Sequence, residues 1–210
     1  MYLSNSKRVW KVLSNLAANP LLLPKYVSNL VNAKTPTELQ LPWWAYKSIS
    51  HIQKSSFEKC FEWGSGGSTF FLAKICNSVT TIENDLNWYN KIRLELQNKE
   101  LHNVSLRHEE IELSDQDGFQ KSAYLNSLDE NYDLITVDGQ DEFGPDSTWS
   151  ARTICFERAQ EFINPKGMII VDDSWRYPEI ETKSKANKIH RFESVGPSRK
   201  GVTRTDIHQY

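Results

Sequence analysis

The sequence contains few cysteines and lacks any long hydrophobic run. Three cysteines occur in 210 residues, far apart and with no CxxC pair. This spacing argues against a disulfide framework and a cysteine-based zinc site, so we expect reduced core thiols at Cys60, Cys76 and Cys155. No apolar stretch reaches the roughly 18 residues of a membrane span, and prolines and polar residues interrupt the N-terminal segment. We therefore expect a cytoplasmic protein without a membrane partner.

The chain also lacks a strong net charge, repeats and low-complexity tracts. Its formal net charge is −2, which gives no overall attraction to nucleic acid. One segment, 183–204, is mainly basic, and we interpret it as a solvated helix face followed by a loop. Because 39% of the residues are hydrophobic and 25% are charged, the composition is that of one globular unit with a sizeable core.

Short apolar runs alternate with longer helical patterns from residue 57 onward, which is typical of a sheet built from βαβ units. We expect strands at 57–63, 79–84, 104–109, 132–138, 168–172, 191–195 and 202–210, and helices at 68–76, 86–99, 119–128, 148–163 and 178–188. Only "GPSRKG" separates the last two strands, so they should form an antiparallel hairpin. The expected fold is α/β, with a Rossmann-like, doubly wound, seven-stranded sheet that is mainly parallel and ends in an antiparallel strand.

The first part of the chain has a different character. Residues 1–55 are rich in Trp and Leu and are punctuated by prolines, so we expect an N-terminal helical cap beside a main domain at 56–210, the two forming one globular unit. Trp43 and Trp44 could line an acceptor pocket or belong to the core. Of the five histidines, only His51 has a claim to a site, through its place near this cap.

Glycines cluster between the first expected strand and the helix after it. In "CFEWGSGGST", Gly64, Gly66 and Gly67 can make a tight turn that brings backbone amides against a ligand. A dinucleotide fingerprint of the GxGxxG type would need a third glycine where Thr69 stands. Glu62 precedes the turn, and Glu83 in "VTTIEND" ends the next strand, roughly 20 residues further along, where a carboxylate can accept hydrogen bonds from ribose hydroxyls.

Taken together, Glu62, the glycine turn, Glu83, "YDLITVDG" and "PKGMIIVDDS" resemble the class I S-adenosylmethionine-dependent methyltransferases. Further blocks such as "LPWWAYKSI" and "VDDSWRYPE" look like those of small bacterial members. The resemblance implies S-adenosyl-L-methionine as cofactor. It implies a cofactor site at Glu62, Gly64, Ser65, Gly66, Ser68, Glu83, Asn84 and Asp138.

Carboxylates end both central strands, at Asp138 and at Asp172 and Asp173, and these positions resemble those of the metal-dependent catechol-type O-methyltransferases. The chain departs from that group because Gln140, Asp141 and Glu142 stand where a lysine is usual. Three alternatives stay open: the three acids bind Mg²⁺, one of them is a general base without a metal, or all are structural. The candidate catalytic residues are Asp138, Asp173 and Arg152, although Arg152, Arg176 and the basic segment could instead pair with the acids.

The sequence favours an enzyme that methylates oxygen on a hydroxylated small molecule, such as a sugar-like compound or a polyol. A nucleic-acid or protein N-methyltransferase is one alternative, but no "NPPY"-like motif follows the fourth expected strand, which makes a nucleic-acid partner unlikely on this pattern. The others are a non-catalytic S-adenosylmethionine-binding module and a nicotinamide-dependent enzyme. A homodimer is among the assemblies that the sequence allows.

Overall fold

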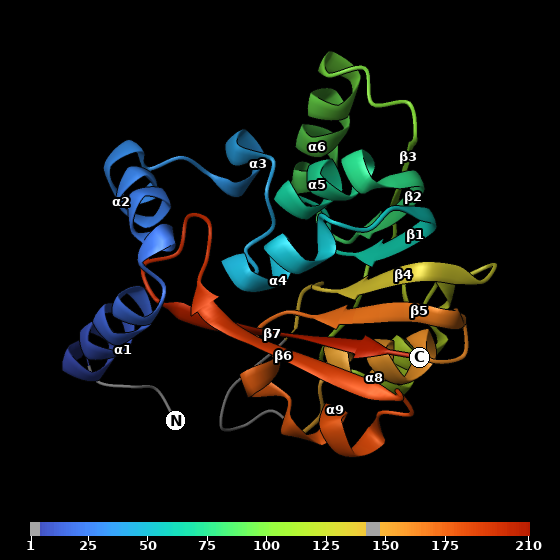
Figure 1. The fold of residues 1–210 in the computed structure, drawn as a ribbon. Helices are drawn as coiled ribbons and strands as arrows, with labels where there is room; N and C mark the ends of the chain where they lie inside the picture. The colour runs from blue at the N-terminus through green and yellow to red at the C-terminus, as the bar shows by residue number, and fades with distance from the viewer. Residues whose placement is uncertain (1–4, 142–147) are drawn as a thin grey trace.

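The computed structural model describes residues 5–141 and 148–210, so Glu142 lies outside the described residues. Its centre is a seven-stranded sheet with the strand order β3-β2-β1-β4-β5-β7-β6 (Figure 1). Strands β1 to β5 are parallel to one another, whereas β7 runs antiparallel to both β5 and β6. The strands are β1 (Phe57–Trp63), β2 (Cys76–Glu83), β3 (Val104–His108), β4 (Tyr132–Val137), β5 (Ile163–Val171), β6 (Lys188–Val195) and β7 (Val202–Gln209).

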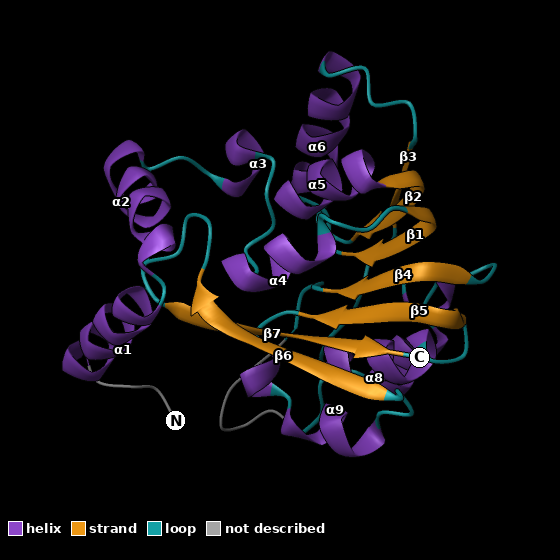
Figure 2. Ribbon diagram, in the orientation of Figure 1, coloured by secondary structure: helices purple, strands orange, loops and turns teal. Residues whose placement is uncertain are grey.

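Helices cover both faces of this sheet (Figure 2). They are α1 (Asn5–Ala18), η1 (Pro20–Leu22), α2 (Leu23–Asn32), α3 (Pro36–Leu39), α4 (Tyr46–Ile52), α5 (Gly67–Ile75), α6 (Leu86–Asn98), α7 (Gln116–Lys121), η2 (Leu125–Ser127), α8 (Ala151–Ala159), η3 (Ser174–Arg176) and α9 (Pro178–Lys183). The predicted fold class is confirmed, including the closing antiparallel hairpin.

Alternation along β1 divides the core into two clusters. Phe61 and Trp63 pack with Phe119 and Phe156 against the side of α7, α8 and α9. Cys60 faces the opposite cluster, to which α1, α4 and α5 contribute. Successive strand residues point to opposite faces, and both faces are apolar because helices bury both.

The N-terminal segment is part of the second cluster rather than a separate layer. Val12 and Leu16 of α1, Trp44 and Ile49 lie in it with the buried residues of β1 and β5. A Cβ atom on Gly196 would lie only 2.4 Å from the carbonyl oxygen of Trp44, so the β6–β7 loop packs tightly on this segment. The carboxyl ends of the parallel strands point toward the side where α1 and α2 lie (Figure 1).

Several element boundaries differ from the sequence-based expectation, most of all those of β5, of the helix expected at 119–128 and of α9. β5 begins at Ile163 instead of residue 168, because an irregularity in its pairing with β4 admits Lys166 at a φ of 70°. The expected helix at 119–128 is two shorter helices, α7 and η2. α9 stops at Lys183, which leaves Lys188 to start β6, so most of the basic segment is sheet and hairpin rather than a helix face.

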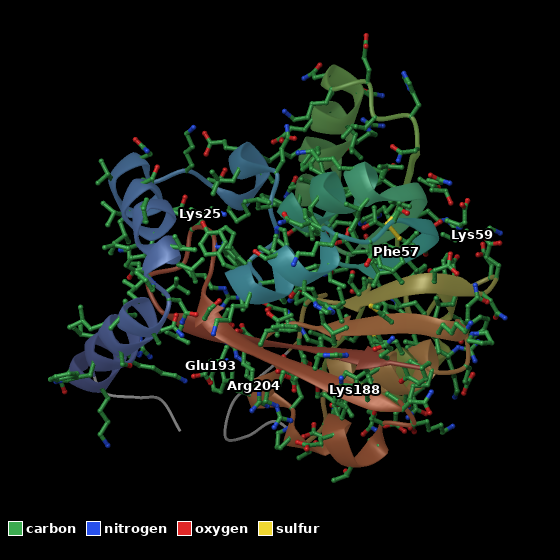
Figure 3. All side chains as sticks on the ribbon, in the orientation of Figure 1. Lys25, Phe57, Lys59, Lys188, Glu193 and Arg204 are labelled. Carbon is green, nitrogen blue, oxygen red and sulfur yellow. A yellow bond between two sulfur atoms is a disulfide. The ribbon has the colours of Figure 1, made fainter. Side chains whose placement is uncertain are left out.

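The expectation of three reduced thiols is wrong. Cys60 and Cys76 form a disulfide, and Cys155 is free and buried. The two cysteines lie on the adjacent parallel strands β1 and β2, and their Cα atoms are 6.3 Å apart although the register pairs Cys60 with Val79 and Cys76 with Phe57. The bond is drawn in yellow in Figure 3. Sequence spacing could not reveal the pair, because the thiols come together only when β1 and β2 lie side by side in the sheet. Such bonds are rare in reducing compartments.

Candidate functional site

The glycine turn joins β1 to α5. Gly64 has a φ of 86°, and a Cβ atom there would lie 2.9 Å from the Cα of Gly139 and 3.0 Å from the carbonyl oxygen of Asp138. A side chain at this position would therefore clash with the end of β4 as well as strain the backbone. Gly67 packs against the carbonyls of Pro36 and Leu41, so the start of α5 is held by the N-terminal segment.

Glu62 is a fully buried carboxyl group just below this turn. One oxygen, Oε2, accepts hydrogen bonds from the hydroxyls of Thr69 (2.6 Å) and Thr81 (3.0 Å). The other, Oε1, has no hydrogen-bond partner among residues 5–141 and 148–210. Burial raises the pKa of Glu62 to about 8, although the nearby hydroxyls of Ser68, Thr69 and Thr81 oppose the shift. A buried acceptor without a partner is costly and indicates a position that a ligand can satisfy.

The Glu83 carboxylate, at the end of β2, holds the glycine turn to the neighbouring strand. Its Oε2 accepts from the amide (2.9 Å) and the hydroxyl (2.7 Å) of Ser65, and its Oε1 accepts from the amides of Asn84 and Asp85 (both 2.9 Å). A carboxylate has about four lone-pair positions, so all are used within the chain. Of the four donors only the Ser65 hydroxyl can rotate away, and a ligand hydroxyl could take its place.

The remaining predicted cofactor residues border the same turn. Gly66 donates its amide to the Thr69 hydroxyl (3.0 Å), and Ser68 is buried in the first turn of α5. Asn84 donates to the side chain of Gln140 (2.6 Å), which links the ends of β2 and β4. The structure thus brings the predicted residues together at the carboxyl edge of β1, β2 and β4.

Asp138 directly follows β4 and pairs with Arg152 of α8, with 3.0 Å between Oδ1 and Nη1. Arg152 also donates to the carbonyls of Gly139 (2.8 Å), Asp138 (3.1 Å) and Asp172 (3.3 Å). Burial raises the pKa of Asp138 to about 7, while the Arg152 charge partly offsets the shift. Asp138 is thus a carboxyl group that titrates near neutrality, and Arg152 fixes the chain around it.

Asp172 and Asp173 lie beyond β5 and are held by Arg199 from the β6–β7 loop. Arg199 contacts Asp172 at 2.6 Å and Asp173 at 2.9 Å, and its Nε donates to the carbonyl of Trp43 (2.6 Å). Thr205 and Thr203 donate one hydroxyl each to the two acids, at 2.9 and 2.6 Å. Burial raises the pKa of Asp172. Burial acts the same way on Asp173, but Arg199, Thr203 and Arg176 together outweigh it and lower the pKa.

These contacts do not fit a metal site. Arginines and threonines, rather than a shared cation, engage the three carboxylates. Throughout the described ranges 5–141 and 148–210, no group of three or more His, Cys, Asp or Glu side chains could hold a metal ion. The predicted Mg²⁺ site at Asp138, Asp172 and Asp173 is therefore not supported, and the alternative interpretation, in which arginines pair with the acids, agrees with the observed contacts.

Sequence reasoning missed several residues of this region. The Tyr124 hydroxyl is buried, has no hydrogen-bond partner in the described part of the chain, and a Cβ atom on Gly139 would lie 2.0 Å from it. The Trp88 indole donates to the carbonyl of Ser65 (2.8 Å). Neither residue belongs to a motif. Thr81 also carries no signal in the sequence, because β2 contains the adjacent Thr80 and Thr81, and only the strand register pairs Thr81 with Glu62.

The two tryptophans and His51 have separate positions. Trp44 is fully buried in the core, where its ring meets Phe71 edge-on. Trp43 is 51% exposed and lies under the Arg199 guanidinium, so it borders the acid cluster. His51 packs beside His190 and Phe192, away from the glycine turn.

Together, the strand order, the glycine turn after β1 and the acids that end β2 and β4 agree with a Rossmann-like methyltransferase fold. No family model and no curated protein sequence matches the chain. No helix in the part of the chain that the structure describes has the length and apolarity of a membrane span.

Several solved structures are similar in fold to this chain. An O-methyltransferase from Bacillus cereus in complex with S-adenosylhomocysteine superposes with a TM-score of 0.59 at 17% identity, covering 94% of this chain and 99% of that one. The N-methyltransferase NodS from Bradyrhizobium japonicum, with the same ligand, gives 0.52 at 14% identity over 78% and 84%. An rRNA methylase from Streptococcus thermophilus gives 0.53 at 12% identity over 84% and 97%. At these identities the likeness is one of fold.

Proposed function

We propose that the chain is an S-adenosylmethionine-dependent methyltransferase that acts on a hydroxyl oxygen of a small molecule. The observation that carries the proposal is the unpartnered Oε1 of the buried Glu62 beside the glycine turn, because an ammonium group would satisfy it. The amino group of the cofactor's methionine part has this chemistry. When bound, the cofactor supplies an electrophilic methyl group on a sulfonium.

In this proposal, the chain's residues bind and orient. Glu62 holds the amino group, and Glu83 accepts a ribose hydroxyl in place of the Ser65 hydroxyl. The backbone passes close to the cofactor at Gly64 and Gly66, and Ser68 and Asn84 complete the border. The first turn of α5 presents amides that favour negative charge.

We assign the role of general base to Asp138, which would accept the proton of the acceptor hydroxyl. Its pKa of about 7 is suited to proton transfer near neutral pH. Asp173 is a weaker candidate, because Arg199 and Thr203 already engage its carboxylate. Arg152 is better described as a positioning residue, since it holds three backbone carbonyls around Asp138. A small-molecule acceptor, a cytoplasmic location and a homodimer stay predictions.

Two relatives in fold, an N-methyltransferase and an rRNA methylase, keep methylation of nitrogen or RNA as the second candidate. Against RNA, several cations of the basic segment are engaged by acids of the chain. Arg191 pairs with Glu181 and Asp206, and Arg199 with Asp172. Less positive charge of this segment is therefore available to neutralise phosphates.

The test is calorimetric titration of the full chain with S-adenosylhomocysteine, followed by a methyl-transfer assay against hydroxylated acceptors, amines and RNA. Glu83→Gln should weaken binding by about 1–3 kcal/mol, because a charge-assisted bond to ribose is lost. Ser65→Ala should leave the affinity within about fivefold, because the lost hydroxyl contributes only about 1 kcal/mol and is the group displaced. Glu58→Gln, an exposed acid on β1, is the matched control.

Absence of binding by the unmodified chain contradicts the cofactor assignment. Binding without transfer to any acceptor favours a non-catalytic module. Transfer only to amines or RNA refutes the hydroxyl acceptor while leaving the cofactor site intact.

A further inference from the structure

Helices α1 and α2 pack on the molecule by only one side each. Val12 and Leu16 of α1 lie in the core, and Asn15 exchanges hydrogen bonds with β6, donating to the carbonyl of Glu193 (3.3 Å) and accepting from the amide of Val195 (3.2 Å). In α2, Tyr26 is buried, and its hydroxyl donates to the carbonyl of Lys200 (3.0 Å). Figure 1 shows both helices at the margin of the molecule.

The other sides of these helices are apolar and exposed. Of the 12 large hydrophobic side chains exposed in the described residues, 8 lie in this short segment. We call them the α1–α2 apolar surface: Val9, Trp10, Leu13, Leu21, Leu23, Val27, Leu30 and Val31. Trp10 is 72% exposed, Val31 76% and Leu21 87%. So dense a group of exposed apolar side chains marks an interaction surface rather than ordinary scatter.

Their spacing makes each helix amphipathic. Val9 and Leu13 are one turn apart on α1 with Trp10 beside them, and α2 carries Leu23, Val27, Leu30 and Val31 at the i, i+4, i+7 and i+8 positions of one face. Core packing therefore does not explain these residues, because the core uses the opposite sides of the same helices.

The charge around this surface has one sign. Residues 1–34 contain no Asp or Glu and five cations: Lys7, Arg8, Lys11, Lys25 and Lys34. Lys11 pairs with Glu193 of β6 at 3.2 Å. Figure 3 labels Lys25 on α2. The segment combines exposed Trp, Leu and Val with Lys and Arg, which is the composition of helices that lie in the interface of an anionic bilayer.

A cavity adjoins the apolar surface. It has a volume of about 580 Å³ and lies between η1, α4 and β6, with Leu21, Leu22 and Phe192 among its apolar lining and Lys47, Lys54 and His51 among its polar lining. Leu21 belongs to both the cavity and the α1–α2 apolar surface. A group with an anionic head and an apolar body matches this lining.

We propose that the α1–α2 apolar surface docks the protein on an anionic lipid bilayer, with its apolar side chains in the interface and its cations at the headgroups. A second copy of the chain is the less favoured occupant, because pairing this surface with itself would bring two acid-free, basic segments together without compensating charge. The proposal goes beyond the methyltransferase activity and does not depend on it. It revises the expectation of no membrane partner, which concerned spanning segments alone.

The test is flotation of the full chain with phosphatidylcholine vesicles and with vesicles in which about a third of the lipid is phosphatidylglycerol. We expect binding to the anionic vesicles that weakens as salt is added, since salt screens exposed charges. The triple variant Trp10→Ser, Val27→Ser, Val31→Ser should bind at least about 10-fold more weakly. Lys7→Gln, Arg8→Gln, Lys25→Gln should lose roughly 100-fold on anionic vesicles.

The matched control is Leu86→Ser, Leu94→Ser, which removes two similarly exposed apolar side chains from α6 and should not change binding. Circular dichroism and urea unfolding of each variant check that it folds. Absence of binding to either vesicle overturns the proposal, as does binding that the control pair reduces equally. Self-association in sedimentation that the triple variant abolishes, without vesicle binding, would assign the surface to a second copy and also overturn it.

Discussion

Replacing Arg199 by methionine tests the assignment of the cluster beyond β5. The substitution keeps most of the apolar stem but removes the charge that lies 2.6 Å from Asp172, whose side chain is only 1% exposed. Thr205 is then the remaining donor described for that carboxylate. Leaving one buried charge uncompensated costs about 3–5 kcal/mol. For a domain of this size, that corresponds to a fall of roughly 6–20 °C in Tm.

The assay is urea unfolding followed by tryptophan fluorescence at about pH 8 and about pH 5. The native state raises the pKa of Asp172, so it binds a proton more tightly than the unfolded state, where the value is about 3.9. Loss of Arg199 raises the pKa further, so the variant's stability should fall as pH rises above that unfolded value. The deficit relative to the unmodified protein should therefore be smaller at about pH 5.

Two variants sharpen the result. Adding Asp172→Asn to Arg199→Met removes the unpaired charge and should recover much of the lost stability. Arg93→Met changes an exposed arginine on α6 and should stay within about 0.5 kcal/mol of the unmodified protein. A loss below about 1 kcal/mol for Arg199→Met, with no pH dependence, would refute the reasoning.

Three further predictions concern Glu62, Asp138 and the disulfide. Because the fold raises the pKa of Glu62 to about 8 from about 4.3, the unfolding free energy should decline as the pH rises through that range. Glu62→Gln should remove this decline and weaken S-adenosylhomocysteine binding. Urea titrations in which the variant and the unmodified protein show the same pH profile would contradict this. Asp138→Asn should lower turnover about 100-fold with little change in cofactor affinity, and turnover of the unmodified enzyme should rise as the pH passes through about 7. Asp117→Asn, at an exposed position, is the control. Equal turnover in the two variants excludes Asp138 as the base. Cys60→Ser should cost about 3 kcal/mol, since the bond joins residues 16 apart, and dithiothreitol should lower the Tm of the unmodified protein but not of the variant.

Sequence patterns predicted the strands well where an apolar run is bounded by turn residues, as in β4 and in the second half of β5. β1 has the predicted bounds, and the acid at the end of β2 lies beside the glycine turn as the strand spacing requires. Element boundaries were less predictable, because an irregular segment such as Asn164 to Gly167 at the start of β5 depends on pairing with β4 and on Lys166 adopting a positive φ. The local sequence propensity includes neither the pairing with β4 nor the positive φ of Lys166.

The candidate site was only partly accessible from sequence. Motif residues such as Glu62, near the end of β1, and Asp138, directly after β4, could be placed at one edge of the sheet. The partner of Asp172 and Asp173 could not, because Arg199 comes from a hairpin loop 27 and 26 residues later and reaches them only through the antiparallel return of β7. Because Arg199 pairs with Asp172 and Asp173, these two carboxylates are already engaged and do not form the metal site suggested by the sequence. The Cys60–Cys76 bond was missed for the same kind of reason, since it depends on β1 and β2 being neighbours in the sheet.

The order of the strands in the sheet differs from their order in the chain. β7 is made after β6 but lies between β5 and β6, so β6 can join the sheet only when β7 has been synthesised. Until then the edge of β5, with Ile169 and Val171, has no partner on that side and offers unpaired backbone groups to other chains. During translation, the growing protein therefore passes through an interval in which its central sheet is open, and folding of this half must wait for the hairpin to close.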